Sequence, residues 1–109
     1  MKKSRIALLV TISMSLIFSG VLTTDAADLS RGEEAFAKHC AVCHAGGGNI
    51  IDADKPLNMK ALRVNGIKTP ADIIRLMRNP ETGMTRFDEK TIDRQTAEDI
   101  AAYILKTFK

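Results

Sequence analysis

Two cysteines and a histidine stand at a spacing that suits one particular cofactor. Cys40, Cys43 and His44 form the motif C-x-x-C-H, which is the attachment site of c-type haem. Two thiols at this separation can add across the two vinyl groups of one porphyrin. The histidine that follows directly lies under the ring and can bind the iron through an imidazole nitrogen. The motif therefore predicts one covalent haem c, linked through Cys40 and Cys43, with His44 as an axial ligand of its iron.

Other uses of these residues fit less well. A thioredoxin-like C-x-x-C pair needs a βαβ setting, and the sequence shows no strand–helix–strand pattern. A structural zinc site usually has four Cys or His ligands, but the two cysteines and two histidines of this chain crowd into positions 39–44, which is too tight to close a tetrahedron. A structural disulfide would be a small, strained loop and would leave His44 unexplained.

The second axial ligand must come from another part of the chain, where the candidates are Met59, Met77, Met84 and His39. His39 sits on the helix that carries the motif and cannot reach the opposite face of the ring. Met77 lies in an apolar helical run, where methionine is usually core filler, and Met59 could line the pocket. Met84 follows Gly83 in a loop, and a loop lets a thioether approach iron end-on. Met84 is therefore preferred, with Met59 or an open position as alternatives.

The first 26 residues are typical of a secretory signal peptide of the Sec type. A positive start, Met1 to Arg5, precedes an apolar run over 6–22, and Thr24 and Ala26 offer small residues for cleavage after Ala26. The alternative is a retained membrane anchor, although the run is short for a span and carries several hydroxyl residues. We expect residues 1–26 to be removed and residues 27–109 to form one domain in the periplasm or the thylakoid lumen, where haem is attached to C-x-x-C-H.

Residues 27–109 form a short polypeptide with a net charge close to zero. The net charge of +3 for the whole chain falls to +1 once the signal peptide is removed, so charge gives no argument for binding nucleic acid. A domain of this size has a small hydrophobic core and often needs a further stabilising element, such as a disulfide, a metal ion or a bound cofactor. We expect the covalent haem to stabilise the fold in this way, and the polypeptide without haem to be largely unfolded.

Helix start and stop signals divide residues 27–109 into about four helices. A capping box at Ser30–Glu33 predicts a helix to about residue 41, and Asn58 can cap a short helix over 59–64. Thr69 followed by proline starts a helix that ends near residue 78, and Asp93 caps the last one. Apolar residues at helical spacing give that last helix a buried face: Ala97, Ile100, Ala101, Ile104 and Phe108.

The chain lacks the period-two alternation of a strand. The glycines at 46–48 follow the haem motif directly and would let the backbone pass close to a flat ring. We therefore expect an all-α fold in which the glycine run lies against the cofactor.

Further residues give the haem motif a wider context. Gly32 and Phe36 extend it to G-x-x-x-F-x-x-x-C-x-x-C-H, and Gly83-Met84 and the stretch 100–104 (IAAYI) follow late in the chain. This order resembles the class I, mitochondrial-like monohaem cytochromes c, and most of all the cytochrome c6 branch. Four other stretches look like that branch, so the resemblance covers essentially all of 27–109: 27–29, 43–49, 55–57 and 72–74.

The resemblance implies a small cytochrome c fold wrapped round one covalent haem, with the first and last helices crossing. Gly32 would be small to allow the crossing, and Phe36 would pack near Tyr103. The axial ligands would be His44 and Met84. One departure is visible, because cytochrome c6 often has Met-Pro and then an aromatic residue where this chain has Met84-Thr85-Arg86-Phe87. Phe87 can take the aromatic place, and Arg86 lies either beside a haem propionate or in solvent.

These features predict a diffusible one-electron carrier and no enzyme. Its donor would be a membrane quinol–cytochrome complex or another cytochrome, and its acceptor an oxidase, a peroxidase or a photosynthetic reaction centre. We expect transient docking of redox proteins by a monomer, through an apolar patch of Val42, Ala45 and 46–48, unless these residues are small for packing only. The alternatives are a membrane-tethered relay that retains 6–22, and a haem sensor or peroxidase, which would need an open sixth site.

Overall fold

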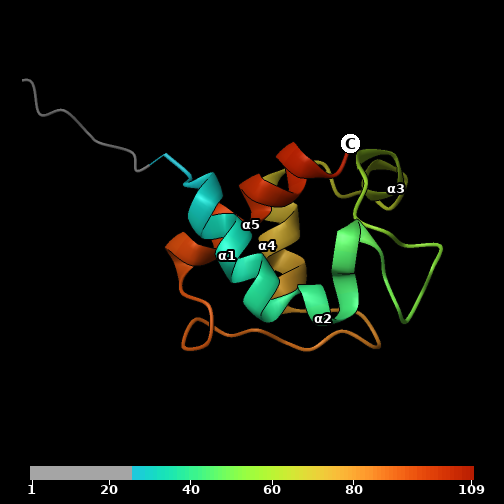
Figure 1. Cartoon of the computed structure of the whole chain (residues 1–109). Coiled ribbons are helices and arrows are strands. Elements are labelled where there is room, and N and C mark those ends of the chain that lie inside the picture. The colour runs from blue at the N-terminus through green and yellow to red at the C-terminus, as the bar shows by residue number, and fades with distance from the viewer. Residues whose placement is uncertain (1–25) are drawn as a thin grey trace, which may run out of the picture.

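The computed structural model describes residues 26–109 (Figure 1). The expected signal peptide falls on residues 1–26 and so lies almost wholly outside the described residues. Over residues 26–109 every regular element is helical, which agrees with the expected all-α fold. In order, these elements are α1 (Leu29–His39), α2 (Ala41–His44), a 3-10 turn (Ala45–Gly47), α3 (Met59–Val64), α4 (Pro70–Arg78) and α5 (Arg94–Thr107).

None of the helices over residues 26–109 has the length and apolar character that crossing a bilayer requires.

The start of α1 differs from the sequence prediction. Asp28, not Ser30, is the N-cap, and its side chain accepts hydrogen bonds from the backbone N–H groups of Ser30 and Arg31. The capping-box interpretation of Ser30–Glu33 is therefore wrong. An aspartate two residues earlier satisfies free N–H groups at the start of the helix and adds negative charge at the positive end of the helix dipole.

The haem motif lies across a break between two helices. α1 ends at His39, two residues earlier than expected, and Cys40 stands between α1 and α2. The N–H of Cys40 still donates to the carbonyl oxygen of Phe36 at 2.8 Å, and the N–H of His44 donates to the carbonyl oxygen of Cys40 at 2.9 Å. The chain therefore turns while it stays hydrogen-bonded, and it presents both cysteines and the histidine within a single short helical turn.

The other helix boundaries agree with their predicted caps. The Asn58 side chain accepts from the N–H of Ala61, and Asp93 caps α5 in the same way. Thr69 and Asp72 form a reciprocal capping box at the start of α4, where Pro70 stands at the first position. The hydrogen bonds that Asp72 accepts from the Lys68 backbone and from Thr69 lower the pKa of its carboxyl to about 2. Local sequence therefore sets these three helix starts.

α1 and α5 pack across each other, as Figure 1 shows. Gly32 is buried at the crossing, and a Cβ atom placed on it would clash with the backbone carbonyl oxygen of Asp99 and lie 3.0 Å from the Cβ of Tyr103. The ring of Phe36 lies 5.4 Å from that of Tyr103 and 5.5 Å from that of Phe108, both at tilted angles. The expected roles of Gly32 and Phe36 are confirmed, because the two helices approach with no room for a side chain at position 32.

A buried carboxylate ties the N-terminal end of α1 to α5. Asp99 is 1% exposed, yet it accepts hydrogen bonds from the N–H of Asp28 at 2.8 Å, from Arg31 Nε at 3.0 Å and from Gln95 Nε2 at 3.1 Å. Burial alone would raise the pKa of this carboxyl, but the three donors and the charge of Arg31 outweigh it, and the pKa is lowered. Asp99 therefore stays ionised inside the helix crossing, and each of its bonds is charge-assisted.

The core lies beside this crossing. The predicted buried face of α5 is confirmed at Ala97, Ile100, Ala101 and Ile104, while Phe108 follows the helix as its C-cap and is partly buried. Buried side chains from α1, α3, α4 and the segment before α5 complete the core: Phe36, Cys40, Leu62, Ile73, Met77 and Ile92.

Candidate functional site

A cavity of about 420 Å³ opens between α2, α4 and the loops that follow α2 and α4. This volume falls in the range of about 300–1,000 Å³ that is usual for ligand and cofactor sites. Its walls are mainly apolar and include residues from the core: Phe36, Leu62, Ile73, Met77 and Ile104. The cavity can take a large, flat, apolar group.

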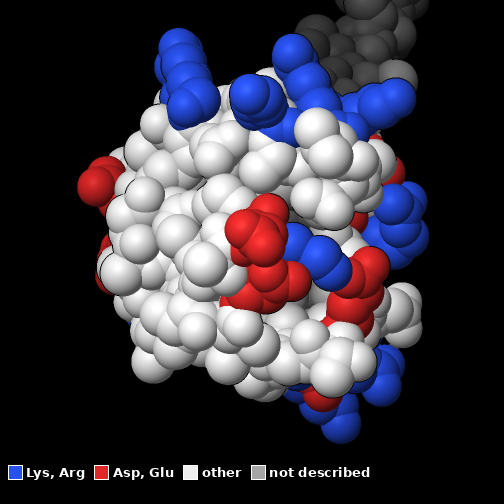
Figure 2. Space-filling view, turned by 90° about the vertical axis from the view of Figure 1, so that its right-hand side faces the viewer, with Lys and Arg blue, Asp and Glu red and all other residues white. Residues whose placement is uncertain are grey.

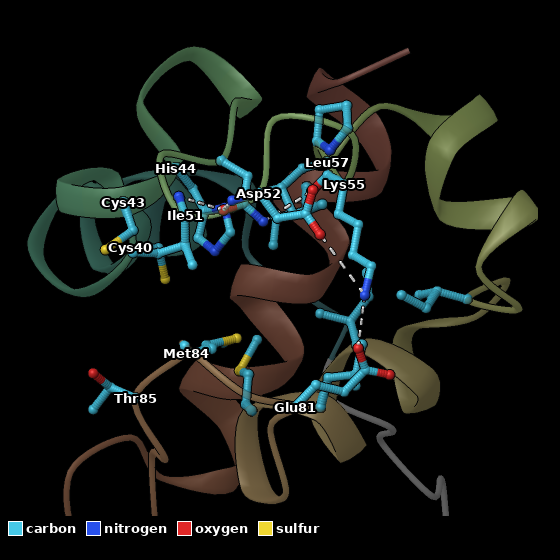
Figure 3. A pocket seen from close by; sticks show the side chains of 18 of the residues that line it. Cys40, Cys43, His44, Ile51, Asp52, Lys55, Leu57, Glu81, Met84 and Thr85 are labelled. Atoms are coloured by element: carbon cyan, nitrogen blue, oxygen red, sulfur yellow. Dashed lines mark hydrogen bonds and ion pairs between the residues drawn. The ribbon is translucent and has the colours of Figure 1, made fainter.

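All four residues predicted to hold haem line this cavity. Figure 3 shows Cys40, Cys43 and His44 along one side and Met84 facing them from the other. Both cysteines are free thiols, and burial raises the pKa of Cys40 to about 11. Cys40 lies at the cavity wall.

The ring of His44 is fixed by a hydrogen bond. Its Nδ1 lies 2.8 Å from the carbonyl oxygen of Gly48. A carbonyl oxygen only accepts, so Nδ1 must carry the proton and Nε2 keeps a free lone pair. Histidines that bind metals almost always donate their other ring N–H to such a partner, which fixes the tautomer and the orientation of the ring. His44 is therefore prepared to bind iron through Nε2.

Met84 reaches the cavity from a loop. Gly83 before it has φ of +98°, a conformation in which glycine is favoured. A Cβ on Gly83 would lie 2.8 Å from the Cγ2 atom of Ile51, so the loop after α4 and the loop after α2 touch at this point. Met84 is 37% exposed. Its thioether can approach a bound group from the side opposite His44 while its backbone stays at the rim.

The other candidates for the sixth ligand take other positions. Met77 also lines the cavity, but it is buried in the core, as a helical methionine usually is. Met59 begins α3 and is not among the residues that line the cavity. His39 lies at the cavity edge, and its ring meets the ring of Phe87 edge-on at 6.2 Å. The arrangement favours Met84 over these three.

The glycine run after the motif packs close to the C-terminal end of the chain. A Cβ on Gly47 would lie 2.5 Å from Cδ1 of Phe108, and Gly46 has nothing within 4 Å of such an atom. The backbone at Gly47 therefore approaches the ring of Phe108, and residues 46–48 are not among those that line the cavity. Gly46 and Gly47 have φ of +63° and +80°, so they also make the turn that brings the Gly48 carbonyl to His44.

A charged cluster closes one end of the cavity mouth, which sequence reasoning did not predict. Lys55 Nζ lies 3.1 Å from Glu81 Oε2 and 3.9 Å from Asp52 Oδ2 (Figure 3). The hydrogen bond to Glu81 and the charge of that residue raise the pKa of Lys55. Lys55 and Glu81 are 26 positions apart, and no sequence pattern indicates such a pair. The pair links the loop after α2 to the loop that carries Met84.

Arg86 is exposed and does not line the cavity. Its Nε donates to the carbonyl oxygen of Arg78 at 2.9 Å. Its side chain is thus exposed and bonded to the backbone at the end of α4. Phe87 does line the cavity, in the place expected of the aromatic residue after the ligand.

The cavity fits a covalently bound haem. Two thiols and a correctly protonated imidazole stand on one wall, a thioether faces them, and the remaining wall is largely apolar. No group of three or more His, Cys, Asp and Glu side chains able to hold a bare metal ion occurs within residues 26–109. Cys40, Cys43, His44 and Met84 are the residues here that could hold a haem, whose iron is bound by His and Met in some cytochromes.

Comparison with known proteins gives one consistent group of relatives. A family model described as cytochrome c oxidase, cbb3-type, subunit III matches residues 27–104. The cytochrome c6 of Synechocystis sp. is 41% identical over 100 residues, which is 92% of this chain and 82% of the relative. The cytochrome c6 of Cyanidium caldarium is 33% identical over 100 residues, which is 92% of this chain and 90% of the relative.

Solved structures of similar proteins have the same fold. The outer membrane cytochrome OmcF of Geobacter sulfurreducens is 40% identical and has a TM-score of 0.70, over 72% of this chain and 99% of that one. The cytochrome c6 of the diatom Phaeodactylum tricornutum is 34% identical and has a TM-score of 0.66, over 73% of this chain and 93% of that one.

Proposed function

This chain belongs to the class I cytochrome c family and carries one covalent haem c, and we propose that His44 and Met84 are the two axial ligands of its iron. Haem bound in this way supplies an iron that alternates between the ferric and ferrous states at a raised potential. The role of the chain is that of a one-electron carrier. Cys40 and Cys43 provide the thioether links, and this assignment rests on the motif and on their place in the cavity.

The single observation that supports this proposal best is the pairing of His44 with Met84 across one cavity. The hydrogen bond from Nδ1 to the Gly48 carbonyl at 2.8 Å leaves Nε2 free, and Figure 3 shows Met84 on the facing side. Two protein ligands fill both axial positions, which keeps oxygen and peroxide from the iron and limits geometric change on electron transfer. A site closed in this way favours electron transfer over catalysis or gas sensing.

Electron exchange requires a surface on which a partner can dock near the cysteines. Val42, between them, is 79% exposed. Ile50 is 70% exposed, and its N–H donates to the Cys43 carbonyl oxygen at 3.0 Å, so it lies beside the motif. Figure 2 shows one face of the molecule, on which uncharged residues surround a central group of acidic and basic side chains and Lys and Arg lie along the upper edge. We propose that Val42 and Ile50 belong to an apolar patch for transient docking.

We further propose that the mature protein is residues 27–109, free in the periplasm or the thylakoid lumen, and that it receives electrons from a membrane cytochrome complex or another cytochrome. A membrane-tethered relay that keeps residues 6–22 is the second candidate. The mass of the purified protein separates the two, because removal of residues 1–26 leaves a chain of 83 residues plus haem.

The ligand assignment is tested by optical spectra of the protein produced with a periplasmic haem-attachment system. The ferrous spectrum is expected to be low-spin and unchanged by carbon monoxide. The ferric protein is expected to show the weak red band of sulfur-to-iron ligation, and Met84→Ala should abolish the band and admit carbon monoxide. Ready binding of carbon monoxide by the unmodified protein would refute a closed His/Met site.

A further inference from the structure

We propose that Arg78 is the positioning residue that holds the Met84 loop closed, and that it does so through the backbone and not through any contact with the haem. This inference rests on the ligation by His44 and Met84 proposed above. It concerns the segment from the end of α4 to the start of α5, residues 79–93, which carries Met84 and has no helix or strand of its own.

The guanidinium of Arg78 binds the far part of this segment at two points. Its Nη1 donates to the carbonyl oxygen of Phe87 at 3.0 Å and to that of Ile92 at 2.8 Å. These acceptors are 9 and 14 positions further along the chain. One side chain at the end of a helix therefore holds two distant points of the segment to α4.

Two more hydrogen bonds join the same places. The N–H of Phe87 donates to the carbonyl oxygen of Met77 at 2.9 Å, and Arg86 Nε donates to the carbonyl oxygen of Arg78 at 2.9 Å. Residues 86 and 87 are thereby fixed against the last turn of α4. Met84 lies on the short exposed arc between residue 78 and residue 86, which the Lys55–Glu81 pair and the contact of Gly83 with Ile51 also hold. Its distance from the cavity therefore depends in part on how residues 78 and 86 are held.

Arginine suits this position better than other residues. Among residues 26–109, no carboxylate lies within ion-pair distance of Arg78, so its hydrogen bonds go to backbone carbonyls alone. Ile92 is 1% exposed, so its carbonyl has little access to water if the guanidinium is removed, and an unsatisfied buried acceptor is costly. Both hydrogen bonds come from Nη1, whose two N–H groups have fixed directions in the planar guanidinium, whereas a lysine ammonium is a single point charge on a flexible stem.

The consequence is an equilibrium between a closed loop, with Met84 near the iron, and an open loop. An outside ligand such as imidazole binds the ferric iron only from the open state, so its apparent affinity reports the fraction of open loop. Loss of the two bonds from Arg78 would raise that fraction, while the haem links at Cys40 and Cys43 and the ligand His44 are untouched.

The test compares imidazole binding and the ferric red band in the unmodified holoprotein and in Arg78→Met, Arg78→Lys and Arg94→Met. Arg94 is the control, because it is exposed, does not line the cavity and pairs with Glu98 in its own helix at 3.1 Å. All measurements are made well below each unfolding midpoint. Arg78→Met is expected to lower the imidazole dissociation constant roughly tenfold or more, since hydrogen bonds to charged groups are the strong ones, and to weaken the red band. The imidazole dissociation constant of Arg78→Lys should lie between those of Arg78→Met and the unmodified protein. That of Arg94→Met should stay within about twofold of the unmodified protein.

A purely structural role for Arg78 gives a different result. The unfolding midpoint would fall in the Arg78 variants while the red band and the imidazole affinity stayed as in the unmodified protein, and this would overturn the proposal. If Arg78→Met yields no haem protein, the imidazole affinity and the ferric red band of Arg78→Lys test the proposal instead. Absence of the red band from the unmodified protein would count against Met84 as ligand, which is a separate failure of the proposed function.

Discussion

Replacement of Gly32 by alanine tests the helix crossing on which the fold depends. A Cβ at this position would clash with the carbonyl oxygen of Asp99, lie 2.7 Å from its carbonyl carbon and lie 3.0 Å from the Cβ of Tyr103. The first two atoms are backbone atoms of α5, so no rotation of a side chain can relieve the contact. α1 and α5 must move apart, and the hydrogen bonds to Asp99 beside the crossing lengthen with them.

The magnitude follows from two opposing effects. Inserting a methyl group into a well-packed site lowers the free energy of unfolding by about 1–3 kcal/mol. Because the methyl group at position 32 would meet backbone atoms, we expect a packing cost of about 3 kcal/mol or more. Alanine is favoured over glycine inside a helix by about 1 kcal/mol. We therefore expect Gly32→Ala to lower the free energy of unfolding by about 2 kcal/mol or more, which corresponds to a fall of about 8–16 °C in Tm for a domain of this size.

The assay is thermal unfolding of the holoprotein, followed by circular dichroism and by haem absorbance. The matched control is Ala37→Gly, which makes the reverse exchange on the exposed side of the same helix. It removes the alanine preference without any packing change, so about 1 kcal/mol of destabilisation is expected. A rise in Tm on Gly32→Ala would refute the reasoning, because it would mean that helix preference outweighs contact at the crossing.

Two further predictions concern the same region. Asp99→Asn should destabilise the protein by about 1.5–3 kcal/mol at pH 7, because it weakens charge-assisted hydrogen bonds to a buried group. The pKa of Asp99 is lowered in the folded state, so its contribution is complete above the unfolded pKa of about 3.9 and is lost as the pH falls below that value. The difference in Tm between Asp99→Asn and the unmodified protein should therefore shrink on acidification below pH 4, and a constant difference down to pH 2.5 would contradict this assignment. Phe36→Leu should cost about 1–3 kcal/mol, since two aromatic contacts are worth about 0.5–1.5 kcal/mol each; a Tm within 2 °C of the unmodified protein would show that Phe36 does not organise the crossing.

The features that sequence predicted well depend on residues close together in the chain. Thr69, Pro70 and Asp72 define the start of α4 within four positions, and the structure places the cap where they stand. The haem motif is equally local. The tautomer of His44 could be predicted only in part. The Gly48 carbonyl that accepts from Nδ1 is only four positions away, but its direction depends on the conformation of the glycine turn.

The features that sequence did not predict depend on distant residues. Asp28 and Asp99 are 71 positions apart, and Lys55 and Glu81 are 26 apart. Taken alone, each of these residues would be predicted to be an exposed charged side chain. Only the path of the backbone brings the members of each pair together. The misplaced cap of α1 has a local cause, because Asp28 and Ser30 both accept hydrogen bonds well and the sequence offered two competing starts.

The long separation between α1 and the helix that covers it also bears on how the protein matures. A contact that spans 71 positions closes late, since the entropy of loop closure must be overcome first, and an exported chain delivers its N-terminal part first. In the export proposed above, the C-x-x-C-H motif would therefore reach the far side of the membrane before the last fourteen-residue helix, α5, is there to pack on α1. In the finished fold Cys40 is only 9% exposed, so its thiol is more accessible before the domain has packed than afterwards. Placing α5 at the opposite end of the sequence leaves both cysteines accessible during the interval in which the cofactor must be joined.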